Sequence, residues 1–319
     1  MDAMTRGAMI LGSVFLSTTT GMSSGALAYQ APQAPIATFT SGVDLVRVSA
    51  IVRDKKGRLV GDLSSRDFEV LDDGQPRAIT EFHRDWSSVS VALLFDVSGS
   101  MEANFAHARE AASHVLSWLE EPTDEGAVFT FDTSLREILP FTSGLRALPD
   151  SVANVVPFGA TSLHDAIAQA ARRAGEREGR HRAVVVFTDG RDTASRLTSE
   201  EVTTIAAGID IPVYIVGVVP SIDNPDADTS TTMGRSAFSG QLVQLAEWTG
   251  GHVFVVSTPA ARSAAARQIV DELRHEYLVA FQSSGTPGWH PLVVRARNKD
   301  LVVRARSGYL AGRSRPISE

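Results

Sequence analysis

The chain has 319 residues, of which 43% are apolar and 21% are charged, and its formal net charge is −7. This length accommodates one large domain or two smaller ones, with enough apolar residues for packed cores. The negative charge excludes a generally basic nucleic-acid binder. Because the chain has no cysteine, disulfides, thiolate metal sites, a cysteine nucleophile and a lipoprotein anchor are excluded as well.

Residues 1–28 have the order of a secretory signal peptide. Arg6 precedes an apolar segment at 8–16, and small residues follow up to Ala28. We expect cleavage after Ala28 and a secreted or periplasmic mature protein. The apolar segment is shorter than the roughly 20 residues that span a bilayer, and no other segment reaches that length, so we expect no membrane span in the mature chain. Residues 29–38 are rich in Ala, Pro and Gln and predict a flexible leader.

The segment that follows the leader, at 43–82, has apolar residues at every second position, which predicts strands. The first strand carries four apolar residues on one face, namely Val46, Val48, Ala50 and Val52. Residues 54–57 predict a turn. Asp72-Asp73-Gly74 predicts a hairpin turn between strands at 68–71 and 78–82.

Between about 88 and 276, continuous apolar runs alternate with helical patterns, which predicts an α/β fold with a doubly wound, mainly parallel sheet. The predicted strands are 89–95, 127–131, 183–188, 213–218 and 253–256, with a short edge strand at 135–139. The predicted helices are 105–119, 163–174, 199–207, 240–248 and 260–275. Residues 223–233, rich in Asp, Ser and Thr, predict a mobile loop.

After residue 277 the two-residue period returns, and the hexapeptide Leu-Val-Val-Arg-Ala-Arg occurs at both 292–297 and 301–306. The polar residues between the copies predict a hairpin. An even-numbered loop puts the apolar residues of both copies on one face and leaves a solvated stripe of Arg295, Arg297, Arg304 and Arg306, whereas an odd loop splits the arginines between the faces. We favour the even loop. The solvated sheet face is the preferred interpretation over an anion-binding patch.

Two-stranded hairpins are marginal in water, so the two β segments are expected to join into one small sheet domain with the α/β domain inserted between its halves. The predicted organisation is a signal peptide at 1–28, a leader at 29–38, the first half of the β domain at 39–87, the α/β domain at 88–276, the second half of the β domain at 277–311 and a tail at 312–319.

Oxygen-bearing side chains cluster where the first α/β strand ends. Asp96, Ser98 and Ser100 are spaced two apart on a loop made tight by Gly99. Side chains at the carboxyl ends of parallel strands meet at one edge of the sheet. Carboxylate and hydroxyl oxygens are hard donors, which favour Mg²⁺, Mn²⁺ or Ca²⁺.

Two further donors lie at the same predicted edge. Thr161 precedes a helix, and Asp189 ends another apolar strand. Each of these residues taken alone is more typical of a turn or a helix cap than of a metal ligand. The combination of all five in this order favours a divalent metal site.

The residues Asp96, Ser98, Ser100, Thr161 and Asp189 resemble the metal-ion-dependent adhesion site of the von Willebrand factor A-type domain. The resemblance extends over about 88–275. It implies that the two serines and the threonine contact the metal directly, that the aspartates bind directly or through water, and that an Asp or Glu of a protein partner completes the coordination. Ala160 and His164 depart from the glycine and tyrosine expected there, but neither position supplies a required oxygen. The flanking segments, 43–82 and 277–310, are similar to those of a bacterial family of exported proteins related to this domain. Residues 68–74 (Phe-Glu-Val-Leu-Asp-Asp-Gly) and Gly308-Tyr309 carry this similarity.

The preferred hypothesis is therefore an exported, non-catalytic adhesion protein that engages a protein partner through a divalent metal. One alternative is a magnesium-dependent hydrolase or phosphoryl-transfer enzyme, for which His164 and Asp192 are weak candidates for a general base. His164 alone is more typical of a helix surface. Another alternative is a structural component of an envelope assembly. We also hypothesise that movement of the helix at 260–275 couples the metal site to the β domain.

Overall fold

The structure is a computed structural model that describes residues 45–84, 88–177, 181–219, 238 and 240–312. The described residues belong to one compact unit, Gly42–Glu319. The predicted signal peptide, the leader and the loop at 223–233 lie outside the described residues. No described helix has both the length and the apolar character needed to cross a membrane.

A six-stranded sheet forms the centre of the α/β region, in the strand order β10-β9-β8-β5-β6-β7. Its strands are β5 (Val89–Asp96), β6 (Glu125–Phe131), β7 (Leu135–Ser143), β8 (His181–Thr188), β9 (Val213–Val218) and β10 (Val253–Val256). All neighbours pair in parallel except β7, which is antiparallel to β6. Every residue of β5, β6 and β9 is buried, because helices cover both faces of the sheet. The predicted α/β class is confirmed.

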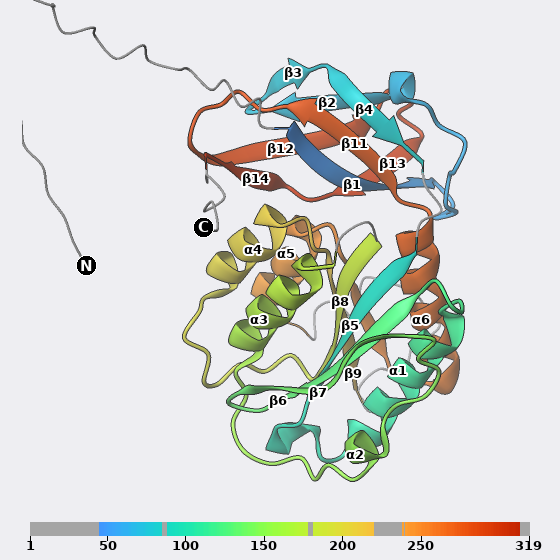
Figure 1. The fold of residues 1–319 in the computed structure, drawn as a ribbon, viewed down its shortest axis with the longest axis vertical. Helices are drawn as coiled ribbons and strands as arrows, with labels where there is room; N and C mark the ends of the chain where they lie inside the picture. Colours follow the sequence, from blue (N-terminus) through green and yellow to red (C-terminus); the bar gives the residue numbers. More distant parts are fainter. Residues whose placement is uncertain (1–44, 85–87, 178–180, 220–237, 239, 313–319) are drawn as a thin grey trace, which may run out of the picture. The chain divides into compact units, whose positions relative to one another are not determined.

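Helices cover the two faces of this sheet, as Figure 1 shows. The helices are α1 (Phe105–Trp118), the short α2 (Asp150–Ala153), α3 (Leu163–Gly175), α4 (Ser199–Gly208), α5 (Gly240–Trp248) and α6 (Pro259–Arg274). Alternate residues of β5 enter different cores: Leu93 packs with α1 and α6, and Leu94 packs with α3, α4 and α5. This alternation follows from the pleat, which points successive side chains to opposite faces.

The flanking segments form two four-stranded sheets. One sheet has the order β13-β1-β11-β4 and the other the order β14-β12-β2-β3. Their strands are β1 (Leu45–Asp54), β2 (Phe68–Asp72), β3 (Gln75–Arg77), β4 (Ile79–His83), β11 (Tyr277–Gln282), β12 (Gly288–Ala296), β13 (Leu301–Ala305) and β14 (Gly308–Ala311). Strands from before and after the α/β region thus share both sheets and bury one common apolar core. The domain boundaries drawn from the sequence stay a prediction.

The predicted hairpin between the two hexapeptide copies is wrong. β12 pairs with β2 and β14, whereas β13 pairs with β1 in the other sheet. The chain therefore crosses from one sheet to the other between the copies. Leu292 and Val294 on β12, and Leu301 and Val303 on β13, still contribute to the same core. The two-residue period determines which face of a strand is buried, but it does not determine the partner strand.

The prediction of a solvated arginine stripe is also wrong for two of its four members. Arg295 is more than half exposed and pairs with a glutamate of β2. Arg304 instead pairs with Glu272 of α6, and Arg306 is buried with its Nε 3.3 Å from Asp210 Oδ1. Because β12 and β13 lie in different sheets, their outward faces meet different surroundings, and Arg304 and Arg306 reach acidic residues of the α/β region.

Glu272 is the buried centre of an ion cluster that joins α6 to this β structure. Its side chain is completely buried, and it pairs with Arg53 of β1 at 2.6 Å and with Arg304 of β13. Gln268 donates a hydrogen bond of 3.0 Å to the same carboxylate. Burial alone would raise the pKa of Glu272, but Arg304, Gln268 and Arg53 together lower it below its ordinary value. The carboxylate is therefore ionised and serves two cations.

Replacing Glu272 with glutamine is expected to lower the free energy of unfolding by about 3 kcal/mol, because two largely buried guanidinium groups lose their counter-charge. Urea unfolding measures this difference. Asp300→Asn is the matched control, because Asp300 pairs with Lys55 where both side chains are well exposed and should cost less than about 1 kcal/mol. Equal effects of the two substitutions would contradict a stabilising role of the Glu272 cluster.

Candidate metal centre

The carboxyl end of β5 carries the first three predicted ligands. The Asp96 side chain is buried, and its Oδ1 accepts a hydrogen bond of 3.0 Å from the backbone N–H of Ser98. Its Oδ2 accepts a hydrogen bond of 2.7 Å from the hydroxyl of Thr188, at the end of β8. The hydroxyls of Ser98 and Ser100 lie 3.2 Å apart. A carboxylate and two hydroxyls are therefore held in one short turn, which continues into a 3-10 helix at Gly99–Met101.

The loop before α3 is joined to this turn by backbone hydrogen bonds. The N–H of Gly99 donates to the carbonyl of Gly159 at 3.1 Å, and the N–H of Phe158 donates to the carbonyl of Val97 at 2.9 Å. Gly159 has a φ of 91°, a left-handed conformation that favours glycine. Thr161 follows two residues later and is buried. The loop that carries Thr161 thus lies against the turn that carries the serines.

The loop after β8 completes the arrangement. Asp189 lies close enough to Asp96 for their negative charges to interact. Thr193 in the same loop accepts a hydrogen bond of 3.0 Å from the backbone N–H of Thr161, and the N–H of Thr193 donates to the Thr161 carbonyl at 2.9 Å. Three loops separated in sequence are therefore bonded to one another at the carboxyl edge of the sheet.

Thr188 and Thr193 support this arrangement, and the sequence interpretation missed both. Thr188 fixes the orientation of Asp96, and Thr193 fixes the backbone of Thr161. Thr188 could have been found from the sequence, because it places a hydroxyl at the end of an otherwise apolar strand, next to the predicted ligand Asp189. Nothing in the sequence marks Thr193, because its role depends on how two loops pack.

Electrostatics distinguish Asp96 from an ordinary carboxylate. Burial, with a smaller contribution from the negative charge of Asp189, raises the pKa of Asp96 from 3.8 to about 6, although the hydrogen bonds from Ser98 and Thr188 lower it in part. Among the described residues no basic side chain forms an ion pair with Asp96. A buried carboxylate without a counter-ion is unfavourable unless a cation or a proton neutralises it.

The donor set fits a hard divalent cation. Two carboxylates and three hydroxyls supply only oxygen, which suits Mg²⁺, Mn²⁺ or Ca²⁺ better than softer metals. The negative charge on Asp96, which no described cation pairs with, is what such a cation would neutralise. Asp189 forms an ion pair of 3.7 Å with Arg191, whose side chain is largely exposed.

His164 and Asp192 lie in contact beside these loops. The Nδ1 of His164 is 3.0 Å from the Asp192 carboxylate, which also accepts a hydrogen bond of 2.9 Å from the His164 backbone N–H. The expectation of a helix-surface histidine is wrong, because the side chain is only 13% exposed. The Nε2 of His164 is buried without a hydrogen-bond partner in the described residues. Burial would raise the pKa of Asp192, but hydrogen bonds from Ser195 and His164 lower it.

A second group of potential ligands, Asp72, Asp73 and His290, lies in the β structure and not at this site. The Nδ1 of His290 is 3.1 Å from an Asp72 oxygen and 2.7 Å from an Asp73 oxygen, and its Nε2 is 2.7 Å from the Thr286 carbonyl. Burial would lower the pKa of His290, but Thr286, Asp73 and Asp72 raise it. Both ring nitrogens face acceptors, and these contacts favour the protonated ring, which binds the two carboxylates as a donor.

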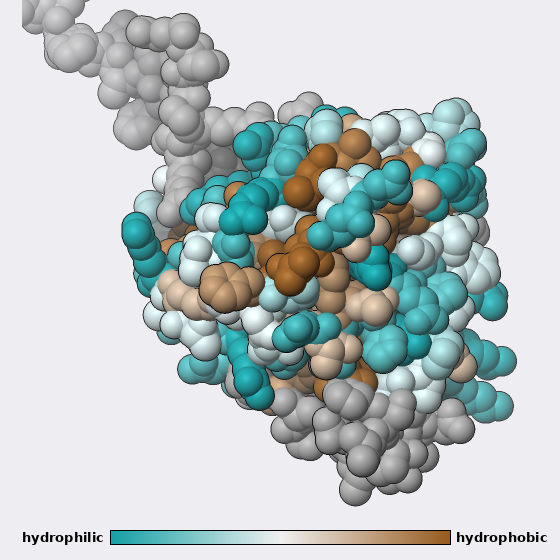
Figure 2. Space-filling view, turned by 90° about the horizontal axis from the view of Figure 1, so that it is seen from below, coloured by the Kyte–Doolittle hydropathy of each residue, from teal (hydrophilic) through white to brown (hydrophobic). Residues whose placement is uncertain are grey.

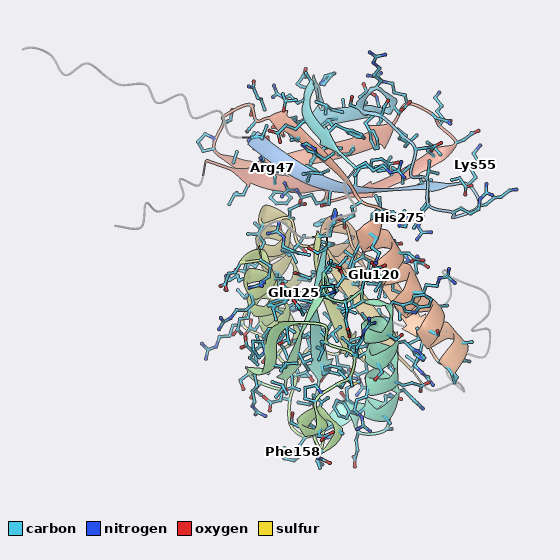
Figure 3. The ribbon with its side chains drawn as sticks, turned by 45° about the vertical axis from the view of Figure 1, so that its right-hand side comes forward. Arg47, Lys55, Glu120, Glu125, Phe158 and His275 are labelled. Carbon is cyan, nitrogen blue, oxygen red and sulfur yellow. The ribbon has the colours of Figure 1, made fainter. Side chains whose placement is uncertain are left out.

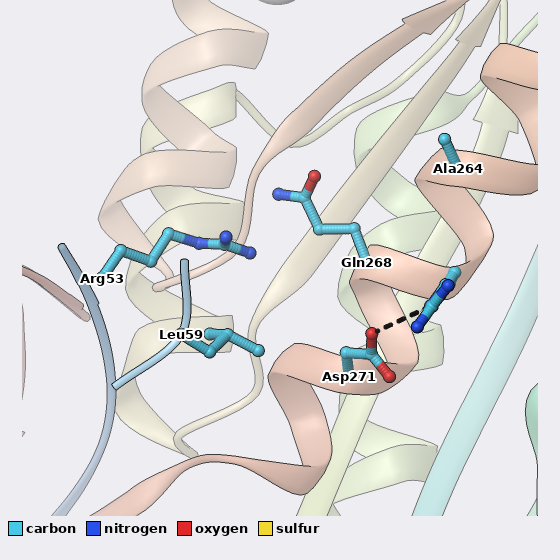
Figure 4. Close-up of a pocket in the computed structure, with 6 residues that line it drawn as sticks. Arg53, Leu59, Ala264, Gln268 and Asp271 are labelled. Carbon is cyan, nitrogen blue, oxygen red and sulfur yellow. Dashed lines mark ion pairs between the residues drawn. The ribbon is translucent and has the colours of Figure 1, made fainter. Parts of the chain in front are cut away.

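A hollow of about 250 Å³ also lies away from the predicted ligands. Figure 4 shows it between β1 and α6, with an ion pair between Arg267 and Asp271 on its wall. Arg53, one of its lining residues, is already paired with Glu272. The hollow therefore belongs to the junction of α6 with the β structure.

Comparison with protein families agrees with the predicted fold. The von Willebrand factor type A domain family matches residues 90–270, more than half of the chain. The chain belongs to this family. Comparison with curated proteins finds no match.

Solved structures similar to this chain include three proteins of low sequence identity. An aerotolerance-related membrane protein from Bacteroides fragilis is 21% identical, with a TM-score of 0.47, over 58% of this chain and 98% of that one. A von Willebrand factor type A protein from Catenulispora acidiphila is 15% identical, with a TM-score of 0.46, over 86% of this chain and 74% of that one. Proximal thread matrix protein 1 from the mussel byssus, whose metal-ion-dependent adhesion site (MIDAS) motif is occupied by zinc, is 16% identical, with a TM-score of 0.46. The match covers 63% of this chain and 49% of that one. The family assignment depends on the family match alone.

In metal-free protein, Asp96→Asn is expected to raise the free energy of unfolding in a pH-dependent way. The pKa of Asp96 is about 6 in the folded state, compared with 3.8 for an ordinary aspartate. The protonated side chain therefore costs no stability below pH 3.8, and the wild-type protein loses stability as the pH rises through 6 and the buried carboxyl ionises. The gain from asparagine should approach ~3 kcal/mol near pH 8 and fall below ~1 kcal/mol near pH 4. Denaturant unfolding in the presence of a chelator measures both values.

Asp150→Asn, at an exposed position in α2, is the matched control for the loss of one carboxylate. It should leave the stability nearly unchanged. A loss of stability near pH 8 in the Asp96 variant would show that Asp96 is compensated in the metal-free fold, in contradiction to the electrostatic interpretation.

Proposed function

We propose that this protein is an exported, non-catalytic adhesion protein that engages a protein partner through a divalent metal. Von Willebrand factor type A domains typically mediate protein–protein interactions, and this chain contains one. The observation that carries the proposal is the buried Asp96 carboxylate, without an ion-pair partner among the described residues, at the meeting point of three loops that supply further oxygens.

The proposed ligands are Asp96, Ser98, Ser100, Thr161 and Asp189. In this proposal the three hydroxyl residues contact the metal directly, and the two aspartates bind directly or through water. Mg²⁺ is the preferred ion, with Mn²⁺ or Ca²⁺ as alternatives. A bound ion would present an open coordination position that attracts an Asp or Glu carboxylate of the partner. The hydrogen bonds from Ser98 and Thr188 hold the Asp96 oxygens in place before any ligand arrives.

Export is proposed from the sequence order of residues 1–28, with cleavage after Ala28 and a secreted or periplasmic location. The proposed domain boundaries, 39–87 with 277–311 for the β domain and 88–276 for the α/β domain, agree with the sheets to which the strands belong. A nucleic-acid partner is not proposed, because the chain is acidic.

Titration with Mg²⁺ is expected to stabilise the wild-type protein. Because a ligand that binds only the folded state adds RT ln(1 + [L]/Kd), a Mg²⁺ concentration about a hundredfold above Kd should add ~2.7 kcal/mol. Asp96→Ala and Thr161→Ala should abolish most of this gain, whereas the surface variant Asp150→Ala should keep it. Thermal or denaturant unfolding at several Mg²⁺ concentrations measures the effect.

A Mg²⁺-dependent stabilisation that survives Asp96→Ala would place the ion elsewhere. No stabilisation of the wild type by Mg²⁺, Mn²⁺ or Ca²⁺ would remove the metal-dependent function altogether. The remaining alternative would then be a structural role in an envelope assembly.

A second candidate function, magnesium-dependent hydrolysis, is favoured by one observation. His164 has its Nδ1 held by Asp192 and its Nε2 unpartnered among the described residues, which is the arrangement of a general base. Turnover of a generic phosphate ester that depends on Mg²⁺ and falls at least tenfold in His164→Asn would support hydrolysis. Turnover at the level of the buffer would leave the adhesive function preferred.

A further inference from the structure

Two apolar side chains are strongly exposed on the loop between α2 and α3. Val156 is 79% exposed and Phe158 is 82% exposed, which makes them the two most exposed large apolar residues that the described part of the chain presents. Figure 3 shows Phe158 at the lower end of the α/β region. Figure 2 shows the molecule from below, where hydrophobic residues (brown) are exposed among hydrophilic ones (teal). A neighbouring residue, Val155, packs against the core. The loop thus turns one apolar residue inward and presents two outward.

The backbone of Phe158 is fixed to the turn that carries the predicted ligands. Its N–H donates to the carbonyl of Val97, and the next residue, Gly159, accepts from the N–H of Gly99. Val97 and Gly99 flank Ser98 directly in the chain. The two hydrogen bonds hold the backbone of Phe158 next to the turn that carries Asp96 and the serines. An aromatic side chain on such a fixed backbone loses little conformational freedom when a partner covers it.

Two other exposed aromatic residues, Trp118 and Trp289, have contacts that account for their position. Trp118 is 40% exposed, and the guanidinium of Arg267 lies over its ring at 5.2 Å from the centroid. Trp289 is 39% exposed and packs against Gly308 in the neighbouring strand β14. Phe158 has no aromatic or cation contact of this kind among the described residues, and its exposure is about twice that of either tryptophan.

We propose that Phe158, assisted by Val156, is the apolar anchor of the partner-binding surface and selects partner segments that carry an apolar side chain near their acidic residue. This inference rests on the proposed function. The chemistry at the site is complementary to such a segment. The metal position and the exposed guanidinium of Arg191 attract the acid, and the Phe158 ring buries the apolar group beside it. Recognition then depends on the spacing of two different groups and not on a carboxylate alone.

The test uses two series of immobilised synthetic peptides in Mg²⁺ buffer, with binding of the full mature chain measured by biolayer interferometry. Each peptide of the first series has a central Asp with a Phe or Leu at one of several neighbouring positions. The second series has Ser in place of the apolar residue. Wild-type protein should bind the best peptide of the first series about tenfold more tightly than its Ser counterpart, and Phe158→Ser should remove this preference. Val156→Ser should reduce it by a smaller factor.

Val302→Ser is the matched control, because Val302 is 62% exposed on β13 and far from the loop in sequence. It should keep the full preference. Binding of the Ser peptides should depend on Mg²⁺, fall on Asp96→Ala and stay unchanged in Phe158→Ser, so that the anchor and the metal are measured separately.

An equal affinity for the two series, or a preference that survives Phe158→Ser, would overturn the anchor and leave the metal-dependent function standing. Metal binding without affinity for any of the peptides would contradict both proposals. Analytical sedimentation of the wild type and of Phe158→Ser tests whether a second copy of this chain, and not a different protein, covers the loop. A wild-type dimer that dissociates in the variant would assign Phe158 to a contact between two copies and overturn the partner proposal.

Discussion

The buried carboxylate of Asp96 is the constraint on which the site depends. The residue ends a strand whose side chains are all buried, so its charge lies where water cannot solvate it. Two hydrogen bonds hold its oxygens but do not neutralise it, and Asp189 adds a second negative charge nearby. An ionised carboxylate at this position lowers the stability of the fold, and a bound cation or a proton would remove that cost.

The loops around Asp96 serve two purposes at once. Hydrogen bonds from Gly99 to Gly159 and from Thr161 to Thr193 join loops from three parts of the chain. A further bond, from the N–H of Phe158 to the carbonyl of Val97, joins the backbone of the exposed Phe158 to the same turn. A metal alone attracts any carboxylate, so selectivity between partners must come from the surface around it. In this protein two exposed apolar side chains, Val156 and Phe158, lie on the loop that is bonded to the turn of Ser98, and this surface is the one that we propose selects the partner.

The junction between α6 and the β structure bears on the hypothesis that this helix moves. Glu272 of α6 binds Arg53 of β1 and Arg304 of β13, and the chain enters β11 directly after the helix. A shift of α6 would either separate buried charges or carry both strands with it. Because separating buried ions is costly, a movement that takes the β structure along is favoured over one that leaves it behind. The β structure is in this sense mechanically tied to the α/β region.

The sequence by itself determined the elements of the α/β region and the residues that could bind a hard cation. Buried parallel strands have continuous apolar runs that differ from those of exposed segments, and oxygen-bearing residues at their ends, such as Asp96 and Asp189, are visible without a structure. Only the tertiary structure decided that the two hexapeptide copies lie in different sheets, that Arg304 and Arg306 are buried, and that Thr193 and His164 adjoin the site. The physical reason is that a local period specifies which side of an element is buried, whereas the identity of the group that covers it depends on contacts between residues far apart in the chain.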